Sequence, residues 1–318
     1  MSSSTRNPTS APRVSVLMPV FNTARYLDDA LDSIGAQSFT DIEFIVVDDG
    51  SSDGSTQMLQ LFAAREPRMK LVTRGNLGLI ATRNELLGAA RGDLVAWMDS
   101  DDISLPQRLA LQINEFDKDP NLVCLGSAAQ CIDPDGNFLN IERYPLLHPQ
   151  ILADQKKGGA MRFPTTMMRR ELALRVGGFR EPFRMGEDFD LLLRLSEIGK
   201  MANLSDTLYL YRQHLASVCA TLGTQWPAYR DCILELAEER RRNGKDRLQN
   251  GGSLSIPRTA EETQNAVRAY HSWAGYALAN GNLPLAWKYA RAAVAARATS
   301  KEAWKMVLRC IRSWFELS

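Results

Sequence analysis

Short apolar runs alternate with amphipathic stretches along the first third of the chain. Four runs have the length and β-rich composition of strands: Val14–Val20, Glu43–Val47, Lys70–Thr73 and Leu94–Met98. Between them, apolar residues recur at helical spacing over Arg25–Ala36, Thr56–Arg65 and Ile80–Ala90. Strands that alternate with helices of roughly ten residues predict right-handed βαβ units and a mostly parallel sheet. The predicted fold class is therefore α/β, with a Rossmann-like sheet flanked by helices.

The middle third of the chain mixes helical and extended signals. Helices are predicted over Pro106–Asp117 and Arg170–Val176, and within Phe183–Glu197 the residues Gly186-Glu187-Asp188 precede a strongly amphipathic helix. Strands are predicted over Leu122–Cys131, Phe163–Met168, Met201–Leu204 and Thr207–Tyr211. The tetrapeptide Asp133–Gly136 has the chemistry of a hairpin turn. Ile141–Gly159 contains prolines and paired glycines, and we interpret it as an irregular connector rather than as a loop bordering a ligand.

The last third of the chain is predicted to be all helical. Gln225–Asn243 forms one helix, and Asn250–Pro257 has the composition of a linker. Tyr270–Ala279 and Pro284–Arg297, joined by a Gly-Asn turn, resemble one tetratricopeptide-type helix pair. Because such arrays need several repeats for independent stability, we expect the pair to pack on the preceding domain or on another copy.

The final predicted helix, Lys301–Phe315, carries apolar and aromatic residues on one side and basic residues beside them. That combination is typical of a helix lying on a membrane surface. A helix that packs on a core and exposes a solvated basic face has the same pattern, and we favour this second interpretation.

Composition excludes several classes of protein. The 318 residues allow one large domain and a smaller one, and the formal net charge of +1 gives no basic field for a nucleic-acid partner. The five cysteines lack CxxC spacing, which argues against zinc or a disulfide framework and fits a reducing cytosol. No apolar run approaches the roughly 20 residues that span a bilayer. Met1–Pro12 has no apolar core, so we expect a disordered tail rather than a signal peptide or anchor.

Polar clusters follow the predicted strands at their carboxyl ends. They are Pro19–Asn22, Asp48–Ser52, Asn76–Gly78 and Asp99–Asp102. In parallel sheets these ends meet at one edge, where ligands bind. The clusters therefore predict a nucleotide-type site. The chain has neither GxGxxG after the first strand nor GxxxxGK[ST], so a dinucleotide fold of the usual kind and a P-loop are disfavoured.

Three carboxylates follow the fourth apolar run, at Asp99, Asp101 and Asp102. Like charges this close repel one another, and a divalent cation relieves the repulsion because hard cations take carboxylate oxygens. Such a cation could balance a bound diphosphate in the absence of a glycine cradle. A solvated acidic loop that caps a helix is the alternative.

Two further candidates lie beyond this loop. Glu187, Asp188 and Asp190 begin a predicted helix, where the helix dipole alone favours acidic residues. One of them would instead serve as a base if it faced the acidic loop, and spacing does not decide between these interpretations. His214 follows a predicted strand, where a histidine is either structural or a ligand for metal or phosphate.

Six motifs occur over Val14–Ser217 in the order VSVLMPVFN, IVVDDGSSDGS, NLGLIATRN, MDSDD, GEDFDL and YRQH. This order resembles family 2 of the inverting glycosyltransferases, with the GT-A fold. The resemblance implies Asp188 as catalytic base, Asp101 of the DxD motif as the main metal ligand, and His214 near the metal and the diphosphate. It implies a nucleotide-sugar pocket lined by Pro19, Phe21, Asn22, Asp49, Arg83, Asp99 and Ser100, with Asp49 on the base and Asp99 on ribose or metal.

The resemblance also sets expectations for the whole protein. Residues 13–217 would form a GT-A domain and 218–318 a helical region. The cofactor would be Mn²⁺ or Mg²⁺, the donor a UDP- or dTDP-sugar, and the acceptor a glycan or a lipid-linked molecule of cell-surface polysaccharide, lipopolysaccharide or glycoconjugate synthesis. We expect a cytoplasmic protein, peripheral at the inner face of the membrane if the last helix contacts lipid, and we leave a homo-oligomer open. The alternatives are a non-catalytic sugar-nucleotide binder or interaction scaffold, and a sugar nucleotidyltransferase.

Overall fold

The computed structural model describes residues 11–155, 157–254 and 265–317. Its chain divides into two units, one comprising residues 1–129 and 143–209, and the other residues 130–142 and 210–318. Most of the predicted tail Met1–Pro12 lies outside the described residues, as do residues 255–257 of the predicted linker.

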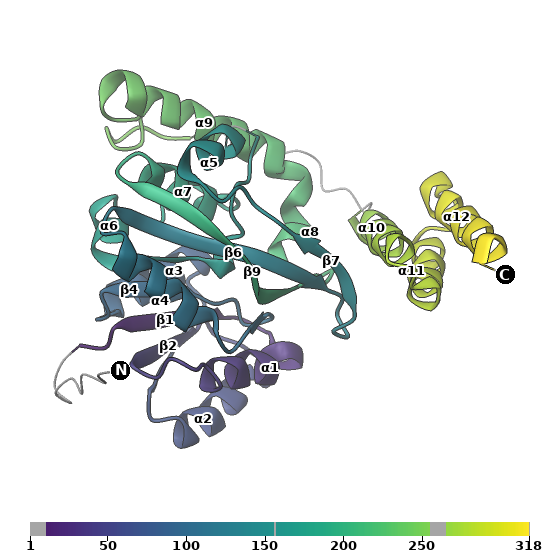
Figure 1. Ribbon diagram of the computed structural model, residues 1–318, viewed down its shortest axis with the longest axis horizontal. Coiled ribbons are helices and arrows are strands. Elements are labelled where there is room, and N and C mark those ends of the chain that lie inside the picture. Colours follow the sequence, from purple (N-terminus) through teal and green to yellow (C-terminus); the bar gives the residue numbers. More distant parts are fainter. Residues whose placement is uncertain (1–10, 156, 255–264, 318) are drawn as a thin grey trace. The chain divides into compact units, whose positions relative to one another are not determined.

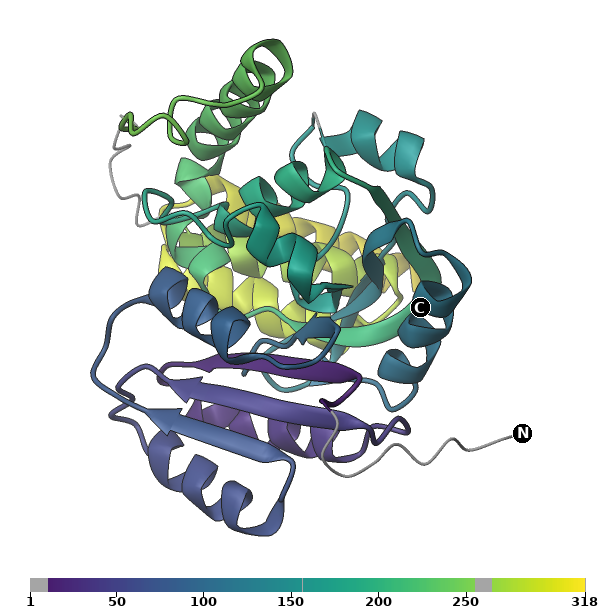
Figure 2. The same cartoon turned by 90° about the vertical axis from the view of Figure 1, so that its left-hand side faces the viewer.

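The first unit begins with four parallel strands in the order β3-β2-β1-β4. These strands are β1 (Val14–Val20), β2 (Ile42–Asp48), β3 (Met69–Thr73) and β4 (Leu94–Trp97). The intervening helices are α1 (Ala24–Gly35), α2 (Ser55–Arg65) and α3 (Leu79–Ala89). Figure 2 shows α1 and α2 on one face of these strands and α3 on the other. Every residue of β1 and β2 is buried, because helices cover both faces. The predicted α/β fold and its parallel βαβ units are confirmed.

Beyond β4 the described pairings are antiparallel. β8 (Met167–Arg169) pairs antiparallel with both β4 and β6 (Leu122–Ile132). These antiparallel pairings make the sheet mixed. The sheet continues from β6 to β9 (Lys200–Arg212), both labelled in Figure 1, and ends at the short strand β5 (Ile103–Ser104). The helices of this part are α4 (Arg108–Lys118), α5 (His148–Gln155), α6 (Arg170–Arg175) and α7 (Glu187–Ser196).

Four local predictions for this part were wrong. The supposed irregular segment Ile141–Gly159 contains α5, whose Ile151 is buried in the core. The predicted strand Phe163–Met168 begins as a 3₁₀ turn over Phe163–Thr165, because the Thr165 and Thr166 hydroxyls donate to nearby backbone carbonyls. The two strands predicted over residues 201–211 are the single strand β9, whose polar residues Ser205 and Asp206 are exposed without ending it. Helix α4 begins at Arg108, two residues after the proline that was expected to open it.

An aromatic cluster fills the core of the first unit behind the ends of the parallel strands. Trp97 of β4 packs against Phe163 and Phe179, with ring centroids 5.4 and 5.1 Å away. Leu191 and Leu195 of α7 belong to the same buried cluster. The apolar side of α7 therefore docks on the core, and the beginning of the helix is held at the edge of the sheet.

The second unit is largely helical. Its helices are α8 (Val218–Leu222), α9 (Trp226–Asn243), α10 (Asn265–Ala279), α11 (Leu283–Ala296) and α12 (Lys301–Leu317), and its strand β7 (Phe138–Glu142) pairs with the end of β6. Figure 1 shows α10, α11 and α12 as neighbouring helices. The predicted helix pair is confirmed, and the Asn282 side chain caps α11 by accepting from the Leu285 N–H. None of the helices in the described ranges is long and apolar enough to cross a membrane.

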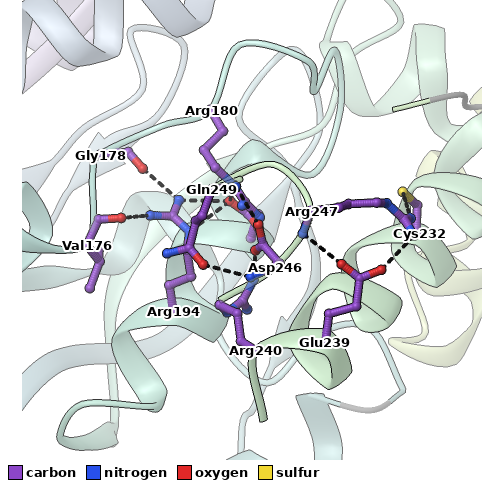
Figure 3. Close-up of polar contacts among 11 residues, drawn as sticks. Val176, Gly178, Arg180, Arg194, Cys232, Glu239, Arg240, Asp246, Arg247 and Gln249 are labelled. Carbon is purple, nitrogen blue, oxygen red and sulfur yellow. Dashed lines mark hydrogen bonds and ion pairs between the residues drawn. The ribbon is translucent and has the colours of Figure 1, made fainter. Parts of the chain in front are cut away.

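Buried polar contacts hold the elements of the second unit together. The Tyr289 hydroxyl of α11 donates to the buried Asp133 carboxylate at the β6–β7 turn, at 2.6 Å. At the end of α9, Arg240 forms a buried ion pair with Asp246 at 2.5 Å, and Arg247 contacts Glu239 at 2.8 Å (Figure 3). These contacts tie the β6–β7 turn to α11, and α9 to the loop that follows it.

Candidate active site

The strand register brings the predicted polar clusters to one edge of the sheet. Val20 of β1 lies opposite Asp48 of β2, and the Asp49 N–H donates to the Val20 carbonyl at 2.8 Å. Leu17 of β1 lies opposite Trp97, and the Met98 N–H donates to the Leu17 carbonyl at 3.0 Å. The loops after β1, β2 and β4 therefore leave the sheet side by side, as the sequence predicted.

Hydrogen bonds join these three loops. Asn22 has a φ of 52°, and its side-chain oxygen accepts from the Ser52 N–H at 2.8 Å. The Thr23 hydroxyl lies 3.0 Å from the Ser100 hydroxyl in the loop after β4. Pro19 is buried within β1, and Phe21 at its end is half exposed. The loop after β1 is thus held in one conformation and exposes an aromatic ring at the edge of the sheet.

Asp49 organises the loop that follows β3. Its buried carboxylate accepts from the backbone N–H groups of Leu77 and Gly78 at 2.8 and 2.9 Å and pairs with Arg74. The Arg74 guanidinium also donates to Glu85 of α3 at 2.7 Å. Because a carboxylate has about four lone-pair positions, these contacts leave capacity for one more donor.

The acidic loop after β4 gathers carboxylates at one point. Asp99, Asp101 and Asp102 each offer an oxygen, and these oxygens lie within 4.8 Å of one another. Asp102 is buried and the other two are half buried. This DxD-like group fits a divalent cation, since Mg²⁺ and Mn²⁺ prefer oxygen ligands and their charge would offset the repulsion among the carboxylates.

The pKa of Asp99 is affected by the charge of Asp188, which comes from a distant part of the chain. Burial, together with the negative charges of Asp101 and Asp188, raises the pKa of Asp99 to about 6 against the opposing effect of the Arg83 guanidinium. The charge on Asp188 therefore acts at the acidic loop, although 87 positions separate Asp188 from Asp101 along the chain. Asp188 and the acidic loop lie at the same edge of the sheet, because Arg83 contacts both Asp99 and Glu187, the residue next to Asp188.

A buried arginine connects this loop to α7. Nη1 of Arg83, on α3, lies 2.5 Å from Oε1 of Glu187, and its Nη2 lies 3.7 Å from Oδ1 of Asp99. The guanidinium also stacks over the rings of Phe163 and Phe179, at 4.8 and 5.5 Å. Burial raises the pKa of Glu187 to about 7, with Arg83 opposing and Asp188 adding to the rise.

The three acidic residues at the start of α7 have different environments. Glu187 pairs with Arg83, as described, and Asp190 is fully buried between Arg180 and Arg194. Arg194 also donates to the carbonyls of Val176 and Gly178 (Figure 3). Asp188 is only half buried, and the backbone N–H of Phe189 donates to its carboxylate at 2.6 Å. The geometry thus separates two structural carboxylates from one that is accessible, a distinction that spacing could not make.

Two buried residues beneath the acidic loop were missed by the sequence interpretation. The Asp99 N–H donates to the Tyr209 hydroxyl at 3.1 Å, and burial raises the pKa of that hydroxyl well above its usual value. Arg108 stacks over the Tyr209 ring at 5.0 Å and donates to the Trp97 carbonyl at 3.0 Å. The sequence signal was weak, because a tyrosine in an apolar strand and an arginine in a helix are both commonplace.

His214 lies in the second unit, in the turn after β9. The neighbouring Gln213 N–H donates to the Ile132 carbonyl at 2.9 Å, and the His214 carbonyl accepts from the Ser217 N–H at 3.3 Å. These contacts fix the turn, and the metal or diphosphate role expected for His214 stays a prediction.

The comparisons with known proteins agree with this geometry. The sequence model of glycosyl transferase family 2 matches residues 15–177. The putative glycosyltransferase EpsE of Bacillus subtilis is 34% identical over 210 residues, which are 64% of this chain and 74% of that protein. The chondroitin synthase of Pasteurella multocida is 29% identical over 199 residues, which are 62% of this chain. The chain spans only 20% to 28% of the chondroitin and hyaluronan synthases that it matches.

Solved structures with a similar fold were also found. S. aureus TarS 1–349 in complex with UDP-GlcNAc has a TM-score of 0.58 at 18% identity, and the match covers 96% of this chain and 92% of that chain. The mannosyltransferase PcManGT from Pyrobaculum calidifontis, in complex with GDP-Man and Mn²⁺, has a TM-score of 0.52 at 21% identity and covers 97% of this chain and 82% of its own. At such identities the likeness concerns the fold, which is of the GT-A type. The chain belongs to glycosyl transferase family 2.

Proposed function

We propose that the protein transfers a sugar from a nucleotide-diphosphate donor to an acceptor hydroxyl with inversion at the anomeric carbon and with the help of a divalent cation. The observation that carries the proposal is the position of Arg83, whose guanidinium contacts both Asp99 of the acidic loop and Glu187, the residue next to Asp188. A general base must lie close to the bound donor, as the start of α7 would if the diphosphate binds at the acidic loop. The two other carboxylates there, Glu187 and Asp190, are buried and each pairs with an arginine.

The donor is proposed to bind along the edge of the sheet. Pro19, Phe21 and Asn22 would contact the nucleoside, and Asp49 would accept from the base with its remaining lone-pair position. Arg83, Asp99 and Ser100 would face the ribose and the diphosphate. This assignment is supported by the hydrogen bonds that already fix the loops after β1 and β2.

A divalent cation is proposed to bind at Asp101, together with Asp99 and, by family resemblance, His214. Bound there, it would neutralise the charge that grows on the departing diphosphate. The convergence of three carboxylate oxygens within 4.8 Å supports such a site. The Mn²⁺ in the PcManGT complex belongs to that protein and makes Mn²⁺ or Mg²⁺ the first ions to test here.

Asp188 is proposed as the general base. A sugar hydroxyl is a poor nucleophile near neutral pH, so removal of its proton during attack accelerates transfer by roughly 10²–10⁴-fold. Attack from the face opposite the leaving group inverts the configuration. Arg83 would hold the beginning of α7 against the acidic loop through Glu187, which keeps Asp188 in place.

We further propose a UDP- or dTDP-sugar as donor and a glycan or lipid-linked molecule as acceptor, in the synthesis of cell-surface polysaccharide, lipopolysaccharide or another glycoconjugate, on the cytoplasmic side. The names of the related chondroitin and hyaluronan synthases support this class of product. Residues 13–217 would form the catalytic domain and residues 218–318 a helical region.

A donor-hydrolysis screen tests the proposal. The full chain is incubated with common nucleotide sugars, with Mn²⁺, Mg²⁺ or a chelator, and nucleotide release is measured for wild type, Asp101→Asn and Asp188→Asn. We expect nucleotide release from one class of donor. This release should require a divalent ion and should fall strongly in Asp101→Asn. If release with chelator and release in Asp101→Asn both equal that of wild type with a divalent ion, the metal assignment would be overturned. If no donor releases its nucleotide although it binds tightly, a non-catalytic binder would be favoured.

A further inference from the structure

Helix α12 of the second unit has two apolar faces. One face is buried, because Ala303, Met306 and Cys310 have no exposed surface and belong to the clusters formed with α10 and α11. The other face is exposed, since Trp304, Leu308 and Phe315 retain 50%, 55% and 77% of their surface. Packing within the unit accounts for the first face only. The second interpretation of this helix, a core-packing helix with a solvated basic face, is therefore incomplete.

The exposed apolar residues form a stripe beside a basic one. Trp304, Leu308 and Phe315, here called the apolar stripe, are separated by four and then seven positions. Lys301, Lys305 and Arg312, here called the basic stripe, have the same separations and precede the apolar stripe by three positions. Residues three apart are neighbours on a helix surface, so the two stripes run side by side along the helix.

The side chains of both stripes lie at the surface. All three residues of the basic stripe are exposed, and none of the ion pairs among the described residues involves them. The Trp304 indole N–H donates to the Ala298 carbonyl at 2.8 Å, which holds its ring at the surface. The Trp314 and Phe315 rings stack with centroids 6.4 Å apart and extend the apolar stripe at its end.

We propose that α12 binds the surface of an anionic lipid bilayer. The apolar stripe would enter the boundary between headgroups and acyl chains, and the basic stripe would contact lipid phosphates. Charge complementarity selects this partner over a second copy of the chain, because another α12 brings the same basic stripe and no acidic one. This proposal does not depend on the donor, the cation or the base of the transfer reaction.

Vesicle flotation of the full chain tests this proposal. Vesicles of phosphatidylcholine alone and of phosphatidylcholine with phosphatidylglycerol are compared at low and high salt. We expect binding to the anionic vesicles only, and weaker binding at high salt. Since one basic residue contributes about fivefold near an anionic surface, Lys305→Gln with Arg312→Gln should weaken binding roughly 25-fold. Leu308→Ser with Phe315→Ser should weaken it by about tenfold or more.

A matched double variant controls for general effects on the surface. Leu61→Ser with Lys245→Gln replaces an exposed leucine of α2 and an exposed lysine after α9 and should leave flotation unchanged. Circular dichroism confirms that each variant is folded, and donor hydrolysis reports separately on the transfer site. The proposal is overturned if anionic and neutral vesicles bind equally, if the α12 variants float like wild type, or if sedimentation shows that the apolar stripe instead holds a dimer together.

Discussion

Arg83 and Glu187 form a buried ion pair, with Nη1 and Oε1 2.5 Å apart, although 104 positions separate them in the chain. Arg83 lies on α3, next to the parallel strands, and Glu187 opens α7. The same guanidinium lies 3.7 Å from Asp99. One side chain thus joins the helix that carries Asp188 to the loop that carries the carboxylate cluster. This pair therefore adds a polar link between the two elements to the core packing of α7.

Replacing Arg83 with Met should destabilise the protein strongly. Removing one partner of a buried ion pair costs about 3–5 kcal/mol, and we expect the lower end because Glu187, with a pKa near 7, can take up a proton. Urea unfolding measures the loss. The control is Arg175→Met, whose pair with Glu171 is exposed on both sides and is expected to contribute less than about 0.5 kcal/mol. Equal losses in the two variants would show that Arg83 does not hold α7.

Asp188→Asn should lower turnover and Asp190→Asn should lower stability, although the two residues lie within one turn of α7. Asp188 is only half buried, so its variant should unfold like wild type and bind donor normally while turnover falls roughly 10²–10⁴-fold. Asp190 is buried between two arginines, so its variant should lose about 3 kcal/mol of stability. Unfolding curves, donor-binding calorimetry and product formation separate the two cases. Full turnover in Asp188→Asn would refute the assignment of the base.

The sequence was most informative where local pattern decides structure. Apolar runs predicted the four parallel strands, and strand polarity then predicted that Asn22, Asp49 and Asp99 would share one edge of the sheet. The pattern of apolar and polar residues did not predict features that depend on tertiary contacts. Nothing local pairs Arg83 with Glu187, or tells the buried Asp190 from the accessible Asp188. Strand β5 is only two residues long, and it exists because the sheet already provides a neighbour.

Glu43 should make stability depend on acid pH. It is buried and accepts from the Ser15 hydroxyl at 2.6 Å, the Lys70 ammonium at 2.6 Å and the Arg91 N–H at 2.7 Å. Burial alone would raise its pKa, but these hydrogen bonds lower it from 4.5 to about 2. The unfolded chain therefore takes up the proton first as pH falls. The stabilisation is fully present above pH 4.5 and is lost as the pH falls toward 2.

Unfolding free energies of wild type and Glu43→Gln, measured between pH 7 and pH 2, test this dependence. The advantage of wild type should be constant at the upper end and should shrink through the acid window. Glu171→Gln, on an exposed pair, is expected to stay within about 0.5 kcal/mol of wild type at every pH. A difference between wild type and Glu43→Gln that is independent of pH would contradict the account.

Two glycines in the loop after β2 offer a test of how that loop is positioned. Gly50 and Gly54 have φ angles of 82° and 101°, so an alanine at either position costs about 1 kcal/mol in backbone strain. A Cβ at Gly50 would lie 2.8 Å from the Asn76 backbone nitrogen, whereas a Cβ at Gly54 would meet nothing within 4 Å. Only the alanine at Gly50 would therefore have to displace the loop that Asp49 holds through Leu77 and Gly78.

We accordingly expect Gly54→Ala to lose about 1 kcal/mol and Gly50→Ala to lose at least about 1 kcal/mol more, because backbone atoms cannot yield as a flexible side chain can. Gly50→Ala should also weaken binding of the nucleoside diphosphate released in the donor screen, since Asp49 and its loop would shift together. Urea unfolding and calorimetry with that nucleotide and Mn²⁺ measure both effects. If Gly50→Ala bound the nucleotide as tightly as Gly54→Ala, the loop after β3 would have no part in the donor pocket, and the role proposed for Asp49 would be wrong.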